Sequence, residues 1–278
     1  MPVNPDEQVQ AVATLFDSVA DTYENVGVNY FSNIAADLLT HVTPIPGERW
    51  LDVGCGRGAV LLPAAAGIGA QGQIVGIDIS ANMLEHTRQA AADRGLTNIE
   101  LFVADAQEPG FDEPTFDTVT CCLVLFFTPN PAAVVATWRR LLTPGGRVGV
   151  TTFGEADPRW AEVDELLGPH MPRWRRESSE EDSPFASDES MERLVSGAGF
   201  TDVRTELGSV DVRFANIDRW FDFSWSHGQR AMWTAMSEND RTTLRADLIG
   251  PLSAIAESDG SLQYRQHIRH TLASQPTT

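Results

Sequence analysis

Apolar positions in the first fifty residues recur at helical spacing. Residues 6–20 and residues 30–42 each place apolar side chains three or four positions apart, which predicts two amphipathic helices. Pro44 and Pro46 follow the second segment, and proline cannot continue a helix. The chain is therefore expected to begin with a helical segment, residues 1–48.

From residue 49 onward, short apolar runs alternate with segments of helical periodicity. Strands alternating with helices at this spacing form a doubly wound, mostly parallel sheet of the α/β class. The predicted strands are residues 49–53, 73–78, 99–104, 116–123 and 147–153, and the predicted helices are residues 59–68, a segment capped by Ser80 and a segment starting at Pro131.

The regular alternation stops after residue 154. A helix is expected at residues 187–198, an extended segment at 201–214, helical structure at 216–256 and a last strand at 262–272. The predicted organisation is an N-terminal helical segment (1–48), a core (49–154), a connecting region with a sixth strand (155–215), a helical cap insertion (216–258) and a last strand with a tail (259–278).

Charge narrows the choice of partners. The chain has 20 basic and 39 acidic residues, a net charge of −19, and all of its basic residues are arginine. Nucleic-acid binding depends on a basic surface, so a nucleic-acid partner is not expected, nor is an anionic membrane. The apolar runs are too short for a membrane helix and the first residues do not resemble a signal peptide, so we expect a cytoplasmic protein. The pattern predicts no particular oligomeric state.

The three cysteines lack the spacing of a metal site. Cys55, Cys121 and Cys122 are an odd number, and two of them are adjacent within an apolar run. We interpret them as reduced, buried thiols and predict no metal ion.

A glycine-rich loop carries the strongest chemical signal. Gly54, Gly56 and Gly58 lie where the first strand turns into a helix, so the backbone can turn tightly and approach a ligand closely. Twenty residues after Gly58, the second strand ends at Asp78, an acid suited to accept hydrogen bonds from ribose hydroxyls. Together these features predict a ligand that contains adenosine.

The glycines alone do not identify the ligand, because the string fits both G-x-G-x-G and the dinucleotide pattern G-x-G-x-x-G/A. Two further acids help to separate the possibilities. Asp52 precedes the first glycine by two residues, and Asp105 ends the third strand, where it could accept the adenine amino group.

With these motifs the sequence resembles the class I S-adenosylmethionine-dependent methyltransferases. It is most similar to the ubiquinone/menaquinone-biosynthesis-like branch and its small-molecule relatives. The resemblance implies a Rossmann-like fold with seven strands, the last one antiparallel, and the apolar spacing adds N-terminal helices and a helical cap. The matching elements are Asp-x-Gly-x-Gly-x-Gly at residues 52–58, Gly-Ile-Asp-Ile-Ser at 76–80, Ala-Asp-Ala at 104–106, Phe-Asp-Thr-Val at 116–119 and Leu-Leu-Thr-Pro-Gly-Gly-Arg-Val at 141–148.

The resemblance also implies how the cofactor S-adenosylmethionine, and its product S-adenosylhomocysteine, would be held. The glycine loop with Cys55 would line the methionine and ribose, Asp52 would lie beneath them, and Asp78 would bind the ribose. The residues expected around the adenine are Ile79, Met83, Asp105 and Ala106, with Leu123 near the methionine. Tyr23 and Tyr30 could close over the cofactor from the N-terminal helices or serve only in packing.

The acceptor side is less defined. The segment ending at Phe127 is apolar and could pack against a hydrophobic substrate. Trp220, Phe223 and Trp225 could form an aromatic lid over that substrate, or the core of the cap. His227 and His170 are candidates for a general base, or structural histidines.

The predicted function is transfer of a methyl group, by in-line SN2 displacement, to a small hydrophobic metabolite such as a quinone precursor or a secondary-metabolite intermediate. Two alternatives stay open at this point. One is an NAD(P)-dependent oxidoreductase, and the other is a protein that binds S-adenosylmethionine on the same fold without methylating anything.

Overall fold

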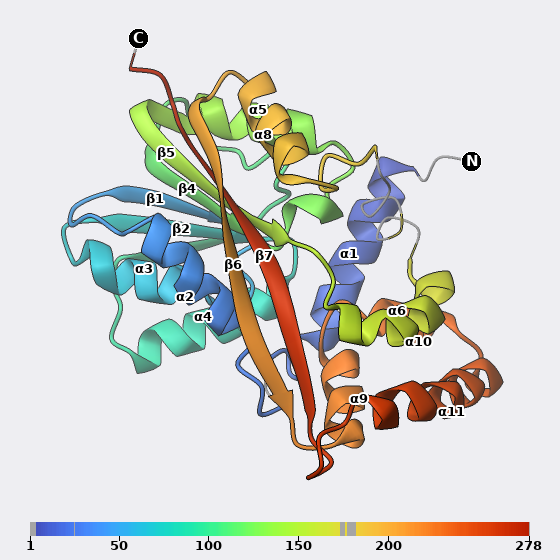
Figure 1. Ribbon diagram of the computed structural model, residues 1–278. Coiled ribbons are helices and arrows are strands. Elements are labelled where there is room, and N and C mark those ends of the chain that lie inside the picture. The colour runs from blue at the N-terminus through green and yellow to red at the C-terminus, as the bar shows by residue number, and fades with distance from the viewer. Residues whose placement is uncertain (1–3, 25, 173–175, 177–181, 278) are drawn as a thin grey trace.

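A seven-stranded sheet runs through the centre of the computed structural model, which describes residues 4–24, 26–172, 176 and 182–277 (Figure 1). The strand order is β3-β2-β1-β4-β5-β7-β6, and β7 is antiparallel to both of its neighbours. This confirms the predicted sheet with an antiparallel last strand. The strands are β1 (Arg49–Val53), β2 (Gln73–Asp78), β3 (Ile99–Val103), β4 (Phe116–Cys122), β5 (Leu142–Phe153), β6 (Thr201–Phe214) and β7 (Leu262–Ser274).

Helices cover both faces of the sheet. One face packs against α2 (Phe31–His41), α3 (Leu61–Ile68) and α4 (Ala81–Asp93), and the other against α5 (Pro131–Leu141) and α8 (Asp188–Gly197). Trp50 and Trp138, both fully buried, lie in these two cores, one on each face. Because both faces are covered, the central strands β1, β2 and β4 are almost continuously buried.

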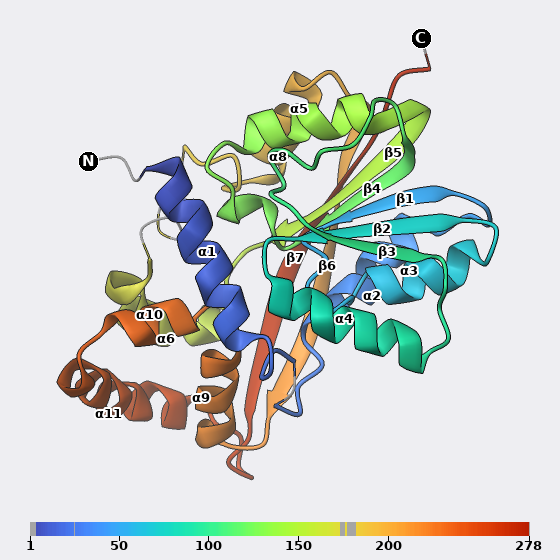
Figure 2. The ribbon, with the colours of Figure 1, turned by 180° about the vertical axis from the view of Figure 1, so that it is seen from behind.

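A third core lies beyond the carboxyl ends of the parallel strands. It is built by α6 (Ala161–Leu167), α9 (Ile217–Ser226), α10 (Arg230–Ala235) and α11 (Glu238–Ala254) against the extended ends of β6 and β7. Helix α6 packs on α11, so residues before β6 contribute to the same helical layer as residues after it. Figure 2 shows α1 (Pro5–Val19) running between α4 and α10.

Most predicted elements occur within one or two residues of their expected bounds, and β5 differs. The fifth strand was expected at residues 147–153. Instead β5 begins at Leu142, and its pairing with β4 is irregular between Phe116 and Thr118. Gly145, with a φ of 80°, accommodates this irregular pairing. The helical stretch expected at 216–256 is divided into α9, α10 and α11.

Three short 3-10 helices complete the described elements: η1 (Leu125–Phe127), η2 (Pro158–Trp160) and η3 (Gly168–His170). No helix in the described part of the chain combines the length and the apolar composition that crossing a bilayer requires.

Close packing between β2 and α3 gives a test of the fold. A Cβ atom on Gly76 of β2 would lie 2.2 Å from Leu61 Cδ1 and 2.9 Å from both Cys55 Sγ and Leu101 Cδ2. Overpacking of this kind costs about 1–3 kcal/mol, so Gly76→Ala should lower the melting temperature by roughly 2–10 °C. The matched control is Gly197→Ala at the end of α8, where an added Cβ meets nothing within 4 Å. Equal melting temperatures for the two variants would contradict this packing.

Candidate functional site

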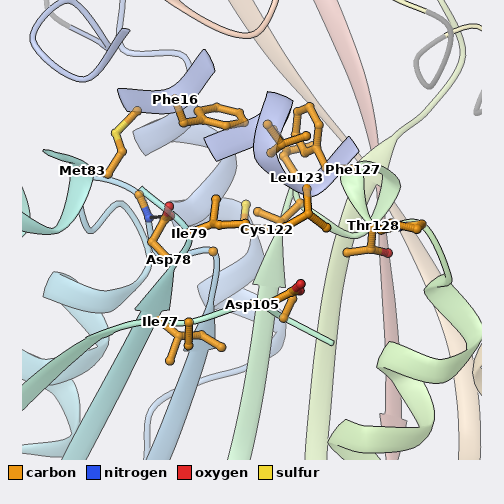
Figure 3. A pocket seen from close by; sticks show the side chains of 18 of the residues that line it. Phe16, Ile77, Asp78, Ile79, Met83, Asp105, Cys122, Leu123, Phe127 and Thr128 are labelled. Atoms are coloured by element: carbon orange, nitrogen blue, oxygen red, sulfur yellow. Dashed lines mark hydrogen bonds between the residues drawn. The ribbon is translucent and has the colours of Figure 1, made fainter. Parts of the chain in front are cut away.

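A pocket lies where the strand order reverses. Strands β1 and β4 are neighbours, and the chain winds outward from them in opposite directions, which leaves a crevice at their carboxyl ends. The pocket encloses about 740 Å³, its open mouth included. Figure 3 shows side chains from β2, the start of α4, the loop after β3, the segment after β4 and helix α1 around it.

The glycine loop between β1 and α3 forms one wall. Gly54 and Gly56 line the pocket, with φ angles of 67° and 52°, and Gly58 behind them has a φ of 85°. A Cβ on Gly54 would lie 2.4 Å from Val124, whereas one on Gly56 would meet no protein atom within 4 Å. The backbone at Gly56 is therefore open to a ligand, and its conformation excludes most side chains.

Cys55 lies behind the loop rather than in the pocket lining. Its backbone N–H donates to the Ile77 carbonyl at 2.9 Å, and its side chain is 4% exposed. Burial raises the pKa of the Cys55 thiol well above its usual value, which makes it an inert packing group.

Asp78 connects the loop to the next helix. Its Oδ2 accepts a hydrogen bond from the Gly56 N–H at 2.8 Å, and its Oδ1 accepts one from the Ser80 N–H at 2.9 Å. Burial raises the pKa of Asp78 to about 6, although both backbone hydrogen bonds oppose the shift. A carboxylate offers about four acceptor positions, so roughly two remain for hydroxyl groups of a ligand.

Asp52 lies beneath the pocket and does not line it. It is 2% exposed, and its Oδ1 accepts a hydrogen bond of 2.8 Å from the Thr120 hydroxyl. That hydroxyl in turn accepts one of 2.8 Å from Trp50 Nε1. Burial raises the pKa of Asp52 to about 7, with a smaller contribution from the charge of Asp78. Two buried carboxylates thus lie at this pocket: Asp78 lines it and Asp52 lies beneath it.

The opposite end of the pocket is mainly apolar. Ile79, Met83 and Ala106 line it, and Asp105 supplies the polar edge. The Asp105 carboxylate accepts hydrogen bonds from the backbone and side-chain nitrogens of Gln107, at 2.9 and 3.1 Å, which fix its orientation. The arrangement suits a flat heterocycle that carries an amino group at one edge.

Helix α1 forms the roof; the sequence suggested closure from the N-terminal helices through Tyr23 and Tyr30, but it did not single out the side chains of α1 that lie there. Val9, Val12 and Phe16 line the pocket from this helix. They belong to the apolar face whose helical spacing predicted α1, so the pattern contained the signal but gave no indication of what the face covers. Asp17 holds the helix in place by accepting a hydrogen bond of 2.6 Å from the Ser80 hydroxyl.

A second, larger cavity adjoins the first. It encloses about 2430 Å³, its mouth included, between the end of β5, the β7 strand, α6, α9 and the N-terminal segment. Aromatic side chains dominate its wall, with a few polar groups among them. Four residues line both cavities: Phe16, Tyr23, Leu123 and Phe127.

Two of these shared residues have unusual features. Leu123 has a φ of 59°, a left-handed conformation that is rare for a branched side chain and concentrates at functional sites. Tyr23 stacks on Phe31 with ring centroids 4.3 Å apart. Burial raises the pKa of the Tyr23 phenol well above its usual value, so the hydroxyl stays neutral.

Of the residues expected around the acceptor, Phe127, Trp220, Phe223 and His227 line the larger cavity. The His227 ring lies 4.4 Å from the ring of Phe223, centroid to centroid, and its Nδ1 accepts a long hydrogen bond of 3.4 Å from the Gln229 N–H. Tyr30, expected near the cofactor, lines this cavity instead, and its hydroxyl donates to Gln266 Oε1 at 2.6 Å.

Trp225 and His170 line neither cavity among the described residues. Trp225 stacks on Trp233 with ring centroids 5.8 Å apart. This contact agrees with the second interpretation of the aromatic residues, in which they form the core of the cap. His170 is exposed at the end of η3. The helical spacing of the aromatic cluster could not separate its members, because apolar side chains of α9 face both the cavity and the neighbouring helix α10.

Comparison with known proteins identifies the chemistry. A family described as "Methyltransferase domain" matches residues 51–146. Nocamycin O-methyltransferase from Saccharothrix syringae is 34% identical, covering 87% of this chain and 91% of that protein. Aklanonic acid methyltransferase from Streptomyces sp. (strain C5) is 36% identical, covering 69% and 93%. A demethylmenaquinone methyltransferase from Symbiobacterium thermophilum matches at 31% over 52% of this chain and 60% of that protein.

Among solved structures, the cyclase SpnF superposes with a TM-score of 0.60 at 20% identity, over 100% of this chain and 99% of that one. This likeness establishes the fold only, and the reaction is identified by the sequence relatives. Because those relatives are methyltransferases, they support the methyltransferase prediction over the oxidoreductase alternative. The chain belongs to the class I S-adenosylmethionine-dependent methyltransferases that act on small molecules.

Proposed function

We propose that the smaller pocket binds S-adenosylmethionine and that the larger cavity binds the methyl acceptor. The observation that carries this proposal is that Phe16, Tyr23, Leu123 and Phe127 line both spaces. In-line transfer requires donor and acceptor to meet within van der Waals distance, so their sites must share a boundary.

The pocket fits the cofactor at both ends. Asp78 would accept hydrogen bonds from the ribose hydroxyls while it keeps those from Gly56 and Ser80. Ile79 and Met83 would pack against the adenine, and Asp105 would accept its amino group. When bound, S-adenosylmethionine supplies a methyl group activated by its sulfonium centre.

The acceptor we propose is an apolar, multi-ring natural product that is methylated on oxygen. The cavity, of about 2430 Å³ with its open mouth included, leaves room for more than a single small ring, and aromatic side chains are the largest group in its wall. The relatives named for nocamycin and for aklanonic acid support a secondary metabolite, and the former is named an O-methyltransferase. A net charge of −19 supports a small-molecule acceptor rather than a nucleic acid.

The protein's own contribution is mainly positional. Phe127 and Leu123 would hold the acceptor oxygen against the transferable methyl, and the aromatic wall would exclude water. For a phenolic acceptor, His227 is the group in this wall suited to remove the proton, since its ordinary pKa lies near neutrality.

A direct assay tests the proposal. The purified protein is incubated with S-adenosylmethionine and either aklanonic acid or a demethylated form of nocamycin. We expect S-adenosylhomocysteine and a product heavier by one methylene unit, detected by mass spectrometry. Binding of both compounds without any product would support the non-methylating alternative instead.

The first prediction concerns the ribose acid. Asp78→Asn removes a charged acceptor and should weaken S-adenosylhomocysteine binding about tenfold or more, since each hydrogen bond to a charged group contributes roughly 1.5–3 kcal/mol. Asp222→Asn is the charge-matched control, on the exposed side of α9 beside Arg219. Calorimetry giving the same dissociation constant for both folded variants would remove Asp78 from the site.

The second prediction concerns pH. The pKa values of about 6 for Asp78 and about 7 for Asp52 are both raised by burial in the free protein. Ribose hydroxyls and a cationic ligand favour the ionised carboxylates, so affinity for S-adenosylmethionine should rise between about pH 5.5 and 7.5.

The stability of the ligand-free protein should change the other way, since a raised carboxyl pKa makes the folded state bind protons more tightly than the unfolded state. Through Asp52 and Asp78, the melting temperature of the ligand-free protein should therefore be higher at pH 5.5 than at pH 7.5. An affinity independent of pH over this window would contradict the assignment.

The third prediction separates the two candidate histidines. His227→Asn should lower kcat/KM for the acceptor at least tenfold and leave S-adenosylhomocysteine affinity unchanged, because His227 lines only the larger cavity. If the residue accepts the proton, the loss falls on kcat and reaches roughly 100-fold or more. His170→Asn, on the exposed η3, should behave as the parent protein. Equal kinetics for the two variants would exclude His227 from the acceptor site.

A further inference from the structure

A cluster of metal-ligating side chains lies away from both cavities, between α2 and the sheet. Asp37 and His41 are four residues apart on α2 and so share one face of that helix. His270, on β7, faces them and is fully buried, whereas Asp37 is one-third exposed. One ligand atom from each of the three residues lies within 4.8 Å of those of the other two.

We propose that Asp37, His41 and His270 form a binding site for a divalent transition-metal ion of the zinc class. Imidazole and carboxylate groups are the ligands that such ions take, and three protein ligands with water in the remaining position form a common open site. The proposal concerns a part of the fold that the transfer reaction does not use.

The separations fit an ion after a small adjustment. Zinc bonds of about 2.0–2.2 Å in tetrahedral geometry place ligand atoms roughly 3.3 Å apart. Asp37 Oδ2 and His270 Nε2 are already 3.2 Å apart. The most widely separated pair of ligand atoms would have to move at most roughly 1.5 Å closer. Rotations about the side-chain torsions can supply this movement, and His41 has more freedom because it is the last residue of α2.

The sheet orients His270 as a ligand. Its Nδ1 lies 2.9 Å from the hydroxyl of Thr151, its register partner on β5. Because a hydroxyl can accept as well as donate, Thr151 can hold the proton on Nδ1 when an ion binds, which leaves the lone pair of Nε2 for the metal. Metal-binding histidines usually have their second nitrogen fixed in this way. The imidazoles of His41 and His270 lie side by side, with ring centroids 5.1 Å apart.

A glycine on β6 makes room for the carboxylate. A Cβ on Gly208 would lie 2.2 Å from Asp37 Oδ2, so any other residue there would displace that oxygen. Gly208→Ala therefore provides a second way to disturb the site, one that shifts a ligand oxygen without replacing any of the three ligand residues.

The consequence of binding would be to tie α2 to β7. Tyr30 and Phe31, at the start of α2, line the larger cavity, so an ion at the other end of this helix would stabilise part of the cavity wall.

The test is metal titration of the full-length chain, without a histidine tag and stripped with a chelator. Zn²⁺ binding is followed by calorimetry, and Co²⁺ binding by its visible absorption. We expect saturation at one ion per chain and a melting temperature that rises with Zn²⁺ concentration. His41→Ala and Gly208→Ala should each weaken binding at least tenfold, with folding checked by circular dichroism.

The control is His86→Ala, which removes a histidine that pairs with Asp21 at the α1–α4 contact. It should bind Zn²⁺ as the parent does. Absence of saturable binding, or equal affinities for His41→Ala and His86→Ala, would overturn the proposal. The two variants each lose one histidine. If Zn²⁺ bound non-specifically to surface imidazoles, His41→Ala and His86→Ala would weaken Zn²⁺ binding equally, and that result would also overturn the proposal.

Discussion

The carboxylate of Asp78 is the interaction on which the rest of the site depends. It accepts hydrogen bonds from Gly56, in the loop after β1, and from Ser80, the N-cap of α4, and so fixes two loops relative to each other. Holding this group under a pocket has a cost, seen in its raised pKa. In the proposed complex, a ligand that brings hydroxyl donors and positive charge would offset that cost, which would link cofactor binding to the order of the loops.

The N-terminal helix encloses the pocket that we propose for the cofactor. Asp17 on α1 accepts a hydrogen bond from the hydroxyl of Ser80, the same residue whose N–H reaches Asp78. One residue therefore connects the roof of the pocket to its floor. Phe16, one position earlier, extends from the roof into the boundary with the larger cavity. In the proposed arrangement, this sharing of side chains would let one helix both enclose the cofactor and contact the acceptor.

Much of the fold could be predicted because local patterns decide it. Alternating periodicity located the strands, and the glycines with Asp78 marked the edge of the sheet at which the smaller pocket lies. Burial on both faces of the sheet explains this success, since buried strands and amphipathic helices leave a clear apolar pattern.

Contacts distant in sequence could not be predicted in the same way. Helical spacing did not distinguish the aromatic residues of α9 from one another, yet Phe223 lines the larger cavity and Trp225 stacks on Trp233. Tyr30 was expected beside the cofactor and lies against Gln266, which is 236 residues away. The convergence of His270 with Asp37 and His41 leaves no local signal either. The last two depend on how β7 returns between β5 and β6, which periodicity does not encode.

The central claim is that methyl transfer occurs at the boundary formed by Phe16, Tyr23, Leu123 and Phe127. A crystal structure with bound S-adenosylhomocysteine tests it most directly. The account predicts the ribose hydroxyls on Asp78 and the sulfur in van der Waals contact with the boundary residues, facing the larger cavity. A sulfur atom directed away from that cavity, or a ribose held elsewhere than at Asp78, would contradict it.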